Sequence, residues 1–404
     1  MPSRKSRHFN ALWSRVRGLV GAEVTPVSED VALEAAALPS YEELQTGCAE
    51  LPAQYADLFL RERSGPEVSI KLQQSNLKTL DDALLAWLGG MPTTLALIGP
   101  SGSGLGSTLA AFATDVESRG LRATTVVPQA RVDSAAALIA QLVDALSLPP
   151  AIASLDELVD ELVRDQQRVV LIEDAQRWFV RRMGVRAALA TLVELILRTR
   201  RRCLWVVSAG SLAWSRLDAL GGLSSVMSEV IECETPDADE LRAIVLTRHS
   251  LSGLELHVAG GPDKPPLLPP TPEYEKALAE YFSKLHTLCG GHPTTAIYYW
   301  RMSVEASESD QALMLTRCPR LVLGDIGSIA TLPRLILAEL SVHGGLVIDY
   351  VADIFPVSTD EARQYLERLR RSGLVERDDD GEYTLNPLVG PHVYPALSRA
   401  HLLY

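Results

Sequence analysis

A glycine-rich loop between an apolar segment and a helical segment is the feature that most constrains the fold of this chain. The loop runs Gly99-Pro-Ser-Gly-Ser-Gly104-Leu105-Gly106-Ser107-Thr108, after an apolar strand expected over 95–98 and before a helix expected over 109–117. In a strand–loop–helix unit of this kind, backbone N–H groups and the helix N-terminus face a bound anion. The loop therefore predicts a phosphate-binding site, with contacts from Gly99, Gly102, Gly104 and Gly106.

The loop departs from the phosphate-binding pattern G-x-x-x-x-G-K-[ST] at its last two positions. Leu105 stands in the lysine position and Gly106 in the hydroxyl position, and no Lys or Arg lies between the loop and Arg119. In a register one residue longer, Ser107 or Thr108 supplies the hydroxyl for Mg²⁺, and Ser107 is the candidate metal ligand. Because the lysine neutralises the β- and γ-phosphates, its loss weakens nucleotide binding and reduces phosphoryl transfer further.

The composition is typical of a globular chain of two or three domains. It has 404 residues, 47% of them hydrophobic and 22% charged, with no apolar run long enough to span a membrane and no signal-peptide pattern. The five cysteines are scattered and never spaced as C-x-x-C, which favours a reducing cytosol over a disulfide framework or a structural zinc site. The net charge of −13 repels nucleic acid at long range. These features predict a cytoplasmic protein.

The first 65 residues are expected to form an N-terminal helical region (1–65). Residues 1–22 are basic, and their apolar residues, Trp13 among them, fall at helical spacing. Such a helix rests on an anionic membrane as a peripheral contact or docks to a partner, and the alternative is that it packs on its own domain. Residues 23–65 are acidic and alanine-rich, with a helix expected over 41–63 and no chemistry.

Residues 66–235 alternate short apolar strands with helices. Strands are expected over 95–98, 123–127, 169–172, 204–207 and 230–231, and helices over 79–88, 109–117, 135–145, 155–165 and 186–199. This alternation predicts an α/β fold in which helices cover both faces of a parallel sheet.

Two further units are expected after the sheet. Residues 236–325 are expected to form a helical lid, with helices over 239–249, 273–288 and 292–307 and a proline-rich surface loop over 260–272. Residues 326–404 are expected to form a winged helix, with helices over 331–342, 350–355 and 359–371 before a hairpin with a charged tip.

A carboxylate pair, Glu173-Asp174, ends the strand expected over 169–172. At this edge of a parallel sheet, opposite the glycine-rich loop, one carboxylate binds Mg²⁺ and the other orients the attacking water. The order Glu-Asp reverses the usual Asp-Glu, and a misplacement of about one ångström costs roughly a hundredfold in rate. Ser208, after the next strand, is the candidate contact to the terminal phosphate or the water. Glu173, Asp174 and Ser208 are thus the candidate catalytic residues.

Two other patterns bear on this site. Gly102-Ser-Gly104 loosely imitates the dinucleotide pattern G-x-G-x-x-G/A, but the second strand runs into Val127-Pro-Gln-Ala-Arg131, without the acidic residue that binds the ribose. The run Arg200-Arg-Arg202 supplies an arginine finger to a neighbouring subunit if the chain forms an oligomer, and is otherwise a solvated helix end.

The charges of the expected winged helix bear on its partner. Its third helix carries several arginines that can contact phosphates, namely Arg363, Arg368, Arg370 and Arg371. The wing, residues 376–382, holds five carboxylates against one arginine. Because a DNA-binding wing lies near phosphates, this charge favours a protein partner or an intramolecular clamp over DNA.

Taken together, residues 66–400 resemble the AAA+-related STAND nucleotide-switch proteins, which combine a P-loop domain, a lid with a Gly-x-Pro turn and a winged helix. The likeness to bacterial STAND-like ATPase modules includes Glu173-Asp-Ala-Gln-Arg-Trp-Phe, Leu204-Trp-Val-Val-Ser, Ala213-Trp214, Arg248-His249-Ser-Leu-Ser-Gly253 and Tyr299-Trp300. The resemblance implies ATP or ADP with Mg²⁺ as the cofactor, and a nucleotide-sensing turn at Gly290-Gly-His-Pro293 in which Pro293 is a candidate contact.

We therefore expect a degenerate nucleotide-binding protein whose nucleotide is bound weakly or vestigially, with little or no hydrolysis by the chain alone. It is expected to act as a regulatory or scaffold subunit through its winged helix and N-terminal helix. Two alternatives stay open: an active ATPase whose missing cation comes from a partner, and a winged-helix DNA-binding regulator.

Overall fold

The computed structural model describes residues 32–34, 51–52, 55, 58–59, 74–100, 102–181, 184–261, 264–307, 311–323 and 325–403. The basic segment 1–22 lies outside these residues, as does most of the helix predicted over 41–63. We refer to residues 74–235 as the sheet unit, to residues 236–323 as the middle unit and to residues 325–403 as the C-terminal unit.

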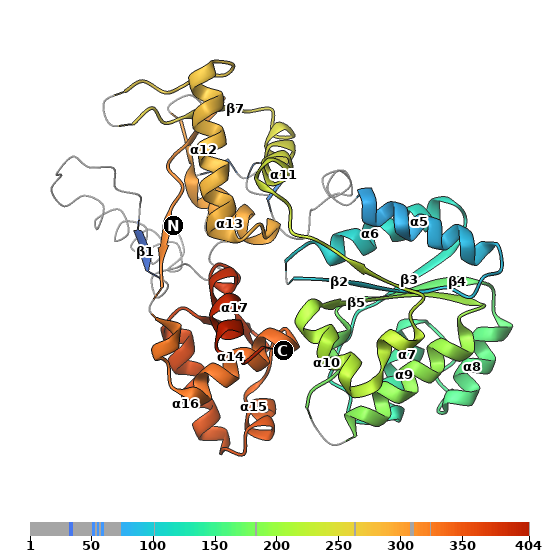
Figure 1. Cartoon of the computed structure of the whole chain (residues 1–404). Coiled ribbons are helices and arrows are strands. Elements are labelled where there is room, and N and C mark those ends of the chain that lie inside the picture. The colour runs from blue at the N-terminus through green and yellow to red at the C-terminus, as the bar shows by residue number, and fades with distance from the viewer. Residues whose placement is uncertain are drawn as a thin grey trace, which may run out of the picture.

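The sheet unit is a five-stranded parallel sheet between two layers of helices (Figure 1). Its strands are β2 (Thr94–Gly99), β3 (Arg122–Val126), β4 (Arg168–Ile172), β5 (Cys203–Gly210) and β6 (Glu229–Glu232), and its helices are α5 (Gln74–Leu88), α6 (Leu105–Ser118), α7 (Ala135–Ala145), α8 (Leu155–Arg164), α9 (Val185–Thr199) and α10 (Ser211–Gly221). The strands lie in the order β3-β4-β5-β2-β6, so β5 lies between the strand that leads to the glycine-rich loop and the strand that leads to Glu173. Helices α5 and α6 cover one face and α7 to α10 the other (Figure 1). The predicted α/β class is confirmed.

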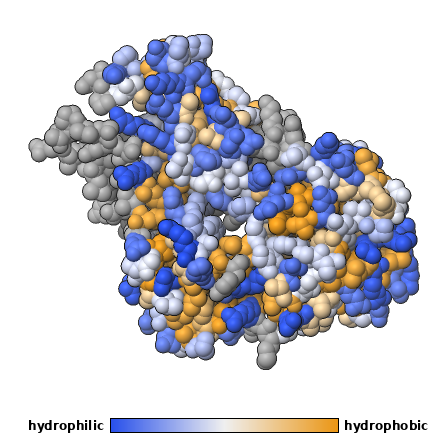
Figure 2. All heavy atoms as spheres, viewed as in Figure 1, coloured by the Kyte–Doolittle hydropathy of each residue, from blue (hydrophilic) through white to orange (hydrophobic). Residues whose placement is uncertain are grey.

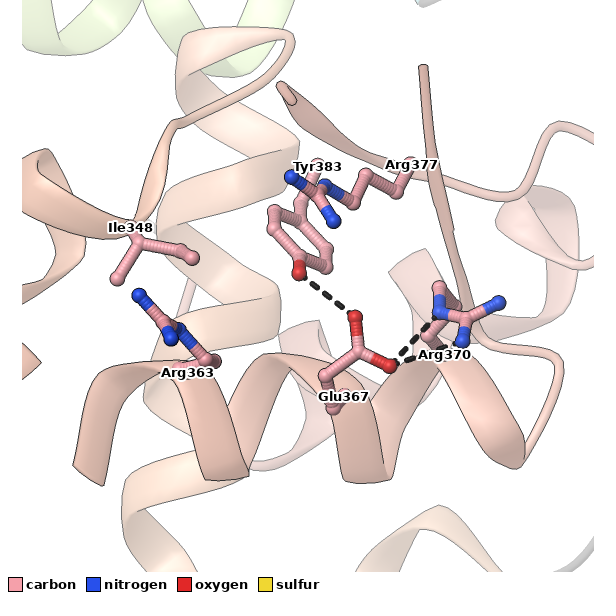
Figure 3. A pocket seen from close by; sticks show the side chains of 6 residues that line it. All are labelled: Ile348, Arg363, Glu367, Arg370, Arg377 and Tyr383. Carbon is pink, nitrogen blue, oxygen red and sulfur yellow. Dashed lines mark hydrogen bonds and ion pairs between the residues drawn. The ribbon is translucent and has the colours of Figure 1, made fainter. Parts of the chain in front are cut away.

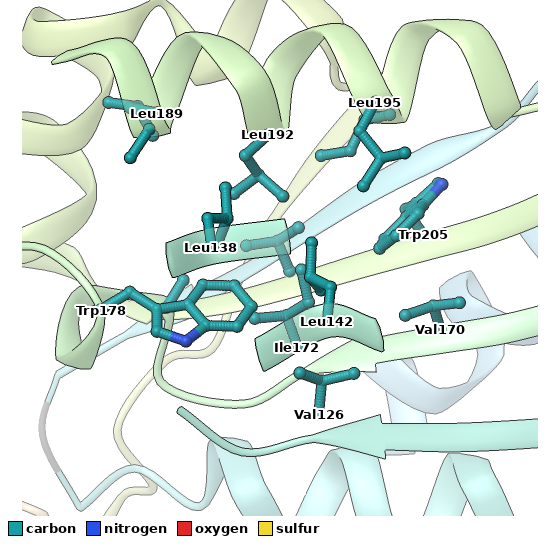
Figure 4. Packing of buried hydrophobic residues seen from close by; sticks show 14 of the residues in the cluster. Val126, Leu138, Leu142, Val170, Ile172, Trp178, Leu189, Leu192, Leu195 and Trp205 are labelled. Atoms are coloured by element: carbon teal, nitrogen blue, oxygen red, sulfur yellow. The ribbon is translucent and has the colours of Figure 1, made fainter. Parts of the chain in front are cut away.

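Alternate side chains of the central strands fill two separate cores. Val170 and Ile172 of β4 pack against α7 and α9, in the cluster drawn in Figure 4. Val169 and Leu171 point to the other face, toward Phe112 and its neighbours on α5 and α6. Because every residue of β4 is buried, the strand is apolar along its whole length rather than alternating with polar residues. Because both faces of β4 are buried, the position of its carboxyl end is fixed, and Glu173 follows directly.

The middle unit combines helices with a small sheet. Its helices are α11 (Ala238–Ser250), α12 (Pro272–Cys289) and α13 (Pro293–Ser303), and its three-stranded sheet consists of β7 (Glu255–Val258), β8 (Val304–Ala306) and β9 (Ala312–Leu315). The helical prediction for residues 304–307 is wrong, because the Ser303 carbonyl accepts hydrogen bonds from both the N–H and the hydroxyl of Thr316 at the end of α13. The chain therefore continues from Ser303 as a strand.

Residues that precede the sheet unit in sequence belong to the middle unit in space. Tyr55 is buried in the core of that unit, where its hydroxyl accepts a hydrogen bond from Trp300 Nε1 (2.9 Å) and lies 3.1 Å from His249 Nδ1. The short strand β1 (Ala32–Glu34) pairs in parallel with β10 (Arg320–Val322).

The C-terminal unit has three helices, a hairpin and a last helix. These are α14 (Thr331–His343), α15 (Ile348–Ile354), α16 (Thr359–Arg371), the antiparallel strands β11 (Val375–Arg377) and β12 (Tyr383–Leu385), and α17 (Gly390–Arg399), which was not predicted. The unit contacts the middle unit through hydrogen bonds from Tyr299 to the Leu388 carbonyl and from Thr295 to the Pro387 carbonyl, both 2.9 Å.

None of the described helices combines the length and the hydropathy needed to cross a bilayer. On the face shown in Figure 2, hydrophobic patches are interspersed with hydrophilic ones over the sheet unit and the C-terminal unit.

Candidate functional site

The glycine-rich loop (residues 99–108) joins β2 to α6 at the carboxyl edge of the sheet. Gly102 and Gly104 have left-handed φ values of 84° and 91°. Helix α6 begins at Leu105, rather than at the predicted residue 109, and no side chain caps its first turn. A helix N-terminus without a side-chain cap, after two left-handed glycines, is a backbone arrangement suited to binding a phosphate.

The lysine position of the loop is part of the hydrophobic core. Leu105 is only 8% exposed and belongs to the cluster that contains Leu80 and Phe112. Thr108 is also buried, and its hydroxyl donates to the Gly104 carbonyl at 3.0 Å, within its own helix. Ser107, in the first turn of α6, is half-buried. Of the two candidate hydroxyls, Thr108 is thus already bonded to the loop, and Ser107 is the more accessible.

Glu173 lies directly against Gly106. A Cβ atom on Gly106 would overlap Oε1 of Glu173, so a side chain at this position requires the carboxylate to move. The end of the flexible Glu173 side chain thus occupies the space beside Gly106, where the usual loop pattern has a hydroxyl side chain. The structure brings Glu173 and the loop together at one point.

Asp174 has a different environment from Glu173. It adopts a left-handed conformation with φ 51°, and its N–H donates to the Ser208 hydroxyl at 3.1 Å. Its Oδ1 accepts a hydrogen bond of 3.0 Å from the side-chain amide of Gln176. Ser208 is fully buried inside β5, which runs to Gly210, beyond the predicted end of the strand at residue 207. Ser208 therefore positions the backbone that follows Glu173.

The turn at residues 290–293 borders the glycine-rich loop from the middle unit. A Cβ atom on Gly102 would lie 3.6 Å from Cβ of Thr294 and 3.8 Å from Nδ1 of His292. Pro293 is the first residue of α13. The predicted turn and the predicted loop are thus neighbours, although about 190 residues separate them in sequence.

Two other predicted features bear on this site: a bound metal ion and the arginine run at residues 200–202. In the part of the chain that the structure describes, no group of three or more His, Cys, Asp or Glu residues could hold a metal ion. A cation at Glu173 would therefore take its other oxygen ligands from phosphates or water. Arg202 donates to the carbonyls of Val163 and Asp165 beside the start of β5, at the opposite edge of the sheet from the loop.

Arg131 joins the C-terminal unit to the segment that follows Glu173. Its Nη1 donates to the Gln176 carbonyl at 2.8 Å, and its Nη2 donates to the carbonyls of His343 (3.1 Å) and Gly345. The carboxylate of Glu382, at the hairpin, lies 3.5 Å away. Burial lowers the pKa of Arg131 to about 10, so the group remains charged at neutral pH. One buried guanidinium thus bonds to both units.

Two further ion pairs strengthen the same contact. Arg177 lies 2.8 Å from Glu382, and Arg216 contacts both carboxylate oxygens of Glu339 at 2.8 and 2.6 Å. His343 lies 3.1 Å from the same carboxylate. Burial raises the pKa of Glu339, but the hydrogen bonds from His343 and Arg216 outweigh it and lower the pKa to about 2. We call Arg131, Arg177, Arg216, Glu339 and Glu382 the interunit latch.

Most residues of this latch carry no recognisable signal in the sequence. Arg131 stands in a loop, and Glu339 stands inside an otherwise apolar helix, without a local motif around either. The acidic wing that contains Glu382 was the one sequence signal that pointed to the contact.

No family model matches the sequence, and no curated protein matches it. Among solved structures, the chain is similar to the Aeropyrum pernix ORC2 protein in its ADPNP–ADP complexes, with 15% identity and a TM-score of 0.46 over 85% of this chain and 96% of that one. It is also similar to Cdc6p from Pyrobaculum aerophilum (16% identity, TM-score 0.45, 86% and 98% covered). A third similar structure is the Aeropyrum pernix ORC1 protein in complex with DNA (13%, TM-score 0.39, 82% and 94%). The resemblance to STAND proteins stays a prediction, and the chemistry of the site follows from its own residues.

Proposed function

We propose that this chain binds an adenine nucleotide at the glycine-rich loop, together with a divalent cation at Glu173, and that it hydrolyses the nucleotide slowly or not at all. The bound nucleotide then serves as a regulatory ligand rather than as a substrate. The observation that carries the proposal is the contact of Glu173 with Gly106, because it places a carboxylate beside the phosphate-binding backbone where no lysine is present.

The residues present fit a divalent cation better than they fit a bare polyphosphate. When bound, the cation neutralises phosphate charge that the loop lysine neutralises in other nucleotide-binding loops. Glu173 supplies an oxygen ligand of the kind that Mg²⁺ prefers. Without the cation, the same carboxylate repels phosphates. We therefore expect nucleotide affinity to depend strongly on Mg²⁺.

Low hydrolysis is supported by what surrounds the loop. The lysine position of the loop holds Leu105, which is uncharged and packed in the core, so this position supplies no positive charge to a bound phosphate. The carboxylate of Asp174 is bonded to Gln176, beside Arg177 of the latch, and its N–H is bonded to Ser208 of β5. Phosphoryl transfer depends on positioned cations and on an oriented water. The leucine in the lysine position removes a cation, and the hydrogen bonds of Asp174 leave its carboxylate less able to orient a water.

We further propose that the C-terminal unit is a winged helix that takes part in protein contacts, as a regulatory or scaffold element. The order of α14, α15, α16 and the β11–β12 hairpin supports this assignment. The latch supports a regulatory role, since Gln176 bonds to Asp174 through its side chain and to Arg131 through its carbonyl. A change at the nucleotide site thus has a short covalent and hydrogen-bonded route to the C-terminal unit.

The test measures binding of ATP by calorimetry with Mg²⁺ and with EDTA, for the wild type, Glu173→Gln and the control Glu117→Gln, an exposed residue at the far end of α6. We expect the wild type to bind Mg²⁺-ATP at least tenfold more tightly than metal-free ATP. Glu173→Gln should weaken Mg²⁺-ATP binding and strengthen metal-free binding, because the repelling charge is gone, while the control behaves as wild type.

Two results would overturn the proposal. The first is absence of nucleotide binding under every condition, which would mean that the loop is not a phosphate site. The second is steady-state turnover on the order of 1 per second that Glu173→Gln abolishes, which would make the chain a working ATPase with a cation from another source.

A further inference from the structure

The C-terminal unit has a second charged site, which the proposed nucleotide function does not use. A pocket of about 530 Å³ opens between α16, the hairpin and the start of α15 (Figure 3). Three arginines line it, Arg363 and Arg370 on α16 and Arg377 at the end of β11, and the other lining residues are Ile348, Glu367 and Tyr383. A volume of this size is typical of sites that hold a small ligand or a side chain with its neighbours.

Only one of the three arginines is neutralised. Both Nε and Nη2 of Arg370 donate to Oε2 of Glu367, at 3.0 and 2.9 Å, and the Tyr383 hydroxyl donates to Oε1 at 2.7 Å. Both oxygens of the carboxylate are thus bonded, and Arg370 lowers the pKa of Glu367, which keeps it ionised. Arg363 and Arg377 form no ion pair with any residue that the structure describes. Two positive charges are therefore left uncompensated in the pocket.

The pocket is held in shape by its own contacts. The Arg377 guanidinium lies 5.5 Å from the centre of the Tyr383 ring, and the two residues are directly paired across the hairpin. Tyr383 is fully buried and is fixed to α16 through Glu367. Ile348, which is half-buried, adds an apolar wall beside the guanidinium groups. Because Arg377 is stacked, less conformational entropy is lost when it binds a ligand.

We propose that this pocket binds a phosphorylated side chain of a protein partner. A phosphoryl group carries a charge of about −1.5 to −2 at neutral pH, which matches the two free guanidinium charges, and it accepts paired hydrogen bonds from arginine. The apolar wall accommodates the stem of the phosphorylated side chain. Clusters of arginine are a recurring way to recognise such groups.

The surroundings of the pocket favour a single phosphoryl group over a nucleic acid strand. Asp378, Asp379 and Asp380 follow Arg377 directly and are exposed. A phosphate backbone that crossed the pocket would pass beside these three carboxylates and be repelled, whereas one phosphoryl group contacts only the arginines. The net charge of −13 on the whole chain acts in the same direction.

The test uses two immobilised libraries of random peptides, one with a fixed phosphorylated residue (serine, threonine or tyrosine in separate pools) and one with the unphosphorylated residue. The full chain is passed over both, as the wild type, as Arg363→Gln/Arg377→Gln and as the control Arg371→Gln, an exposed arginine on the same helix outside the pocket. We expect at least tenfold more wild-type protein on one phosphorylated pool than on its unphosphorylated counterpart. The double variant should lose this preference and the control should keep it, with melting temperatures unchanged.

Four outcomes would overturn the proposal. Equal retention on phosphorylated and unphosphorylated pools would show that the pocket does not recognise the phosphoryl group. Equal loss in Arg371→Gln would show that only overall charge matters. Competition by inorganic phosphate at the same concentration as phosphopeptide, or tighter binding to duplex DNA than to any peptide pool, would assign the pocket to a free anion or to nucleic acid. None of these results depends on whether ATP binds at the glycine-rich loop.

Discussion

Oε2 of Glu382 lies 2.8 Å from Nη2 of Arg177, so the tip of the C-terminal hairpin touches the segment that follows the strand-end carboxylates. One of the five carboxylates of residues 376–382 is thereby turned toward the sheet unit. Arg131 lies 3.5 Å from the other oxygen of the same carboxylate. It also donates hydrogen bonds to three carbonyl groups, one in the sheet unit and two in the C-terminal unit. The contact between the units thus combines these charged groups with the apolar packing of Val180 in the core of the C-terminal unit. Its polar part depends unequally on the two arginines.

Arg131→Gln is expected to lower the free energy of unfolding by about 3 kcal/mol, because it removes a buried charge and leaves carbonyl groups without a donor. Arg177→Gln should cost less than about 1 kcal/mol, since Arg177 is 44% exposed. Urea denaturation measures both, with the exposed Arg164→Gln as a control. Equal small losses for Arg131 and Arg177 would mean that the buried guanidinium does not hold the units together.

Stability should fall in acid because of Glu339. The folded pKa of about 2 lies below the ordinary value of 4.5, so the stabilising charge is fully present above about pH 5 and is lost as the pH falls toward 2. A shift of that size corresponds to on the order of 3 kcal/mol. Glu339→Gln should be less stable at pH 7 and should show a flatter pH dependence between pH 5 and 3. The exposed control Glu234→Gln should follow the wild-type curve, and a wild-type-like slope in Glu339→Gln would contradict the assignment.

Restoring the usual loop residues requires a third change. Gly106→Thr places its Cβ against Oε1 at the end of the Glu173 side chain, so the carboxylate has to move away from the loop. Leu105→Lys/Gly106→Thr should therefore not improve Mg²⁺-ATP binding. Adding Glu173→Asp shortens the opposing side chain, and the triple variant should bind Mg²⁺-ATP at least tenfold more tightly than the double variant. Calorimetry decides this, and an equally tight double variant would show that Glu173 moves freely away from Gly106.

Duplex DNA is expected to bind more weakly than about micromolar at physiological salt, with a shallow dependence on salt concentration. The reason is the row of carboxylates between β11 and β12, which stands beside the arginines of α16. Fluorescence anisotropy over a salt series measures both quantities. Tight binding that is lost in Arg368→Gln/Arg371→Gln would instead favour the DNA-binding alternative.

The α/β core could be predicted because its signals are local. Apolar runs mark β2, β4 and β5, and the predicted bounds of α7 and α16 agree with the structure because Ser134 and Ser358 cap their first turns. The strands β7, β8 and β9 were missed, since each is three or four residues long and too short to show a period. Helix α6 was placed too late, because a loop that contains four glycines is not typical of the start of a helix.

The candidate site was predictable only in its parts. The glycine-rich loop and Glu173 each stand in a recognisable pattern, but their contact at Gly106 depends on the strand order, which periodicity does not reveal. Arg131 and its acceptors at 343 and 345 are more than 200 residues apart, and no short-range pattern links them. The pocket around Arg363 and Arg377 likewise depends on how the hairpin folds back onto α16.

The burial of Tyr55 against Trp300 has a consequence for the order in which the protein assembles during synthesis. The partners of Tyr55 at 249 and 300 leave the ribosome only after the whole sheet unit has been made. The sheet unit can therefore complete its two cores while Tyr55 still lacks the residues against which it packs. Closing of the middle unit is then a late event that ties the beginning of the chain to a segment translated about 245 residues later.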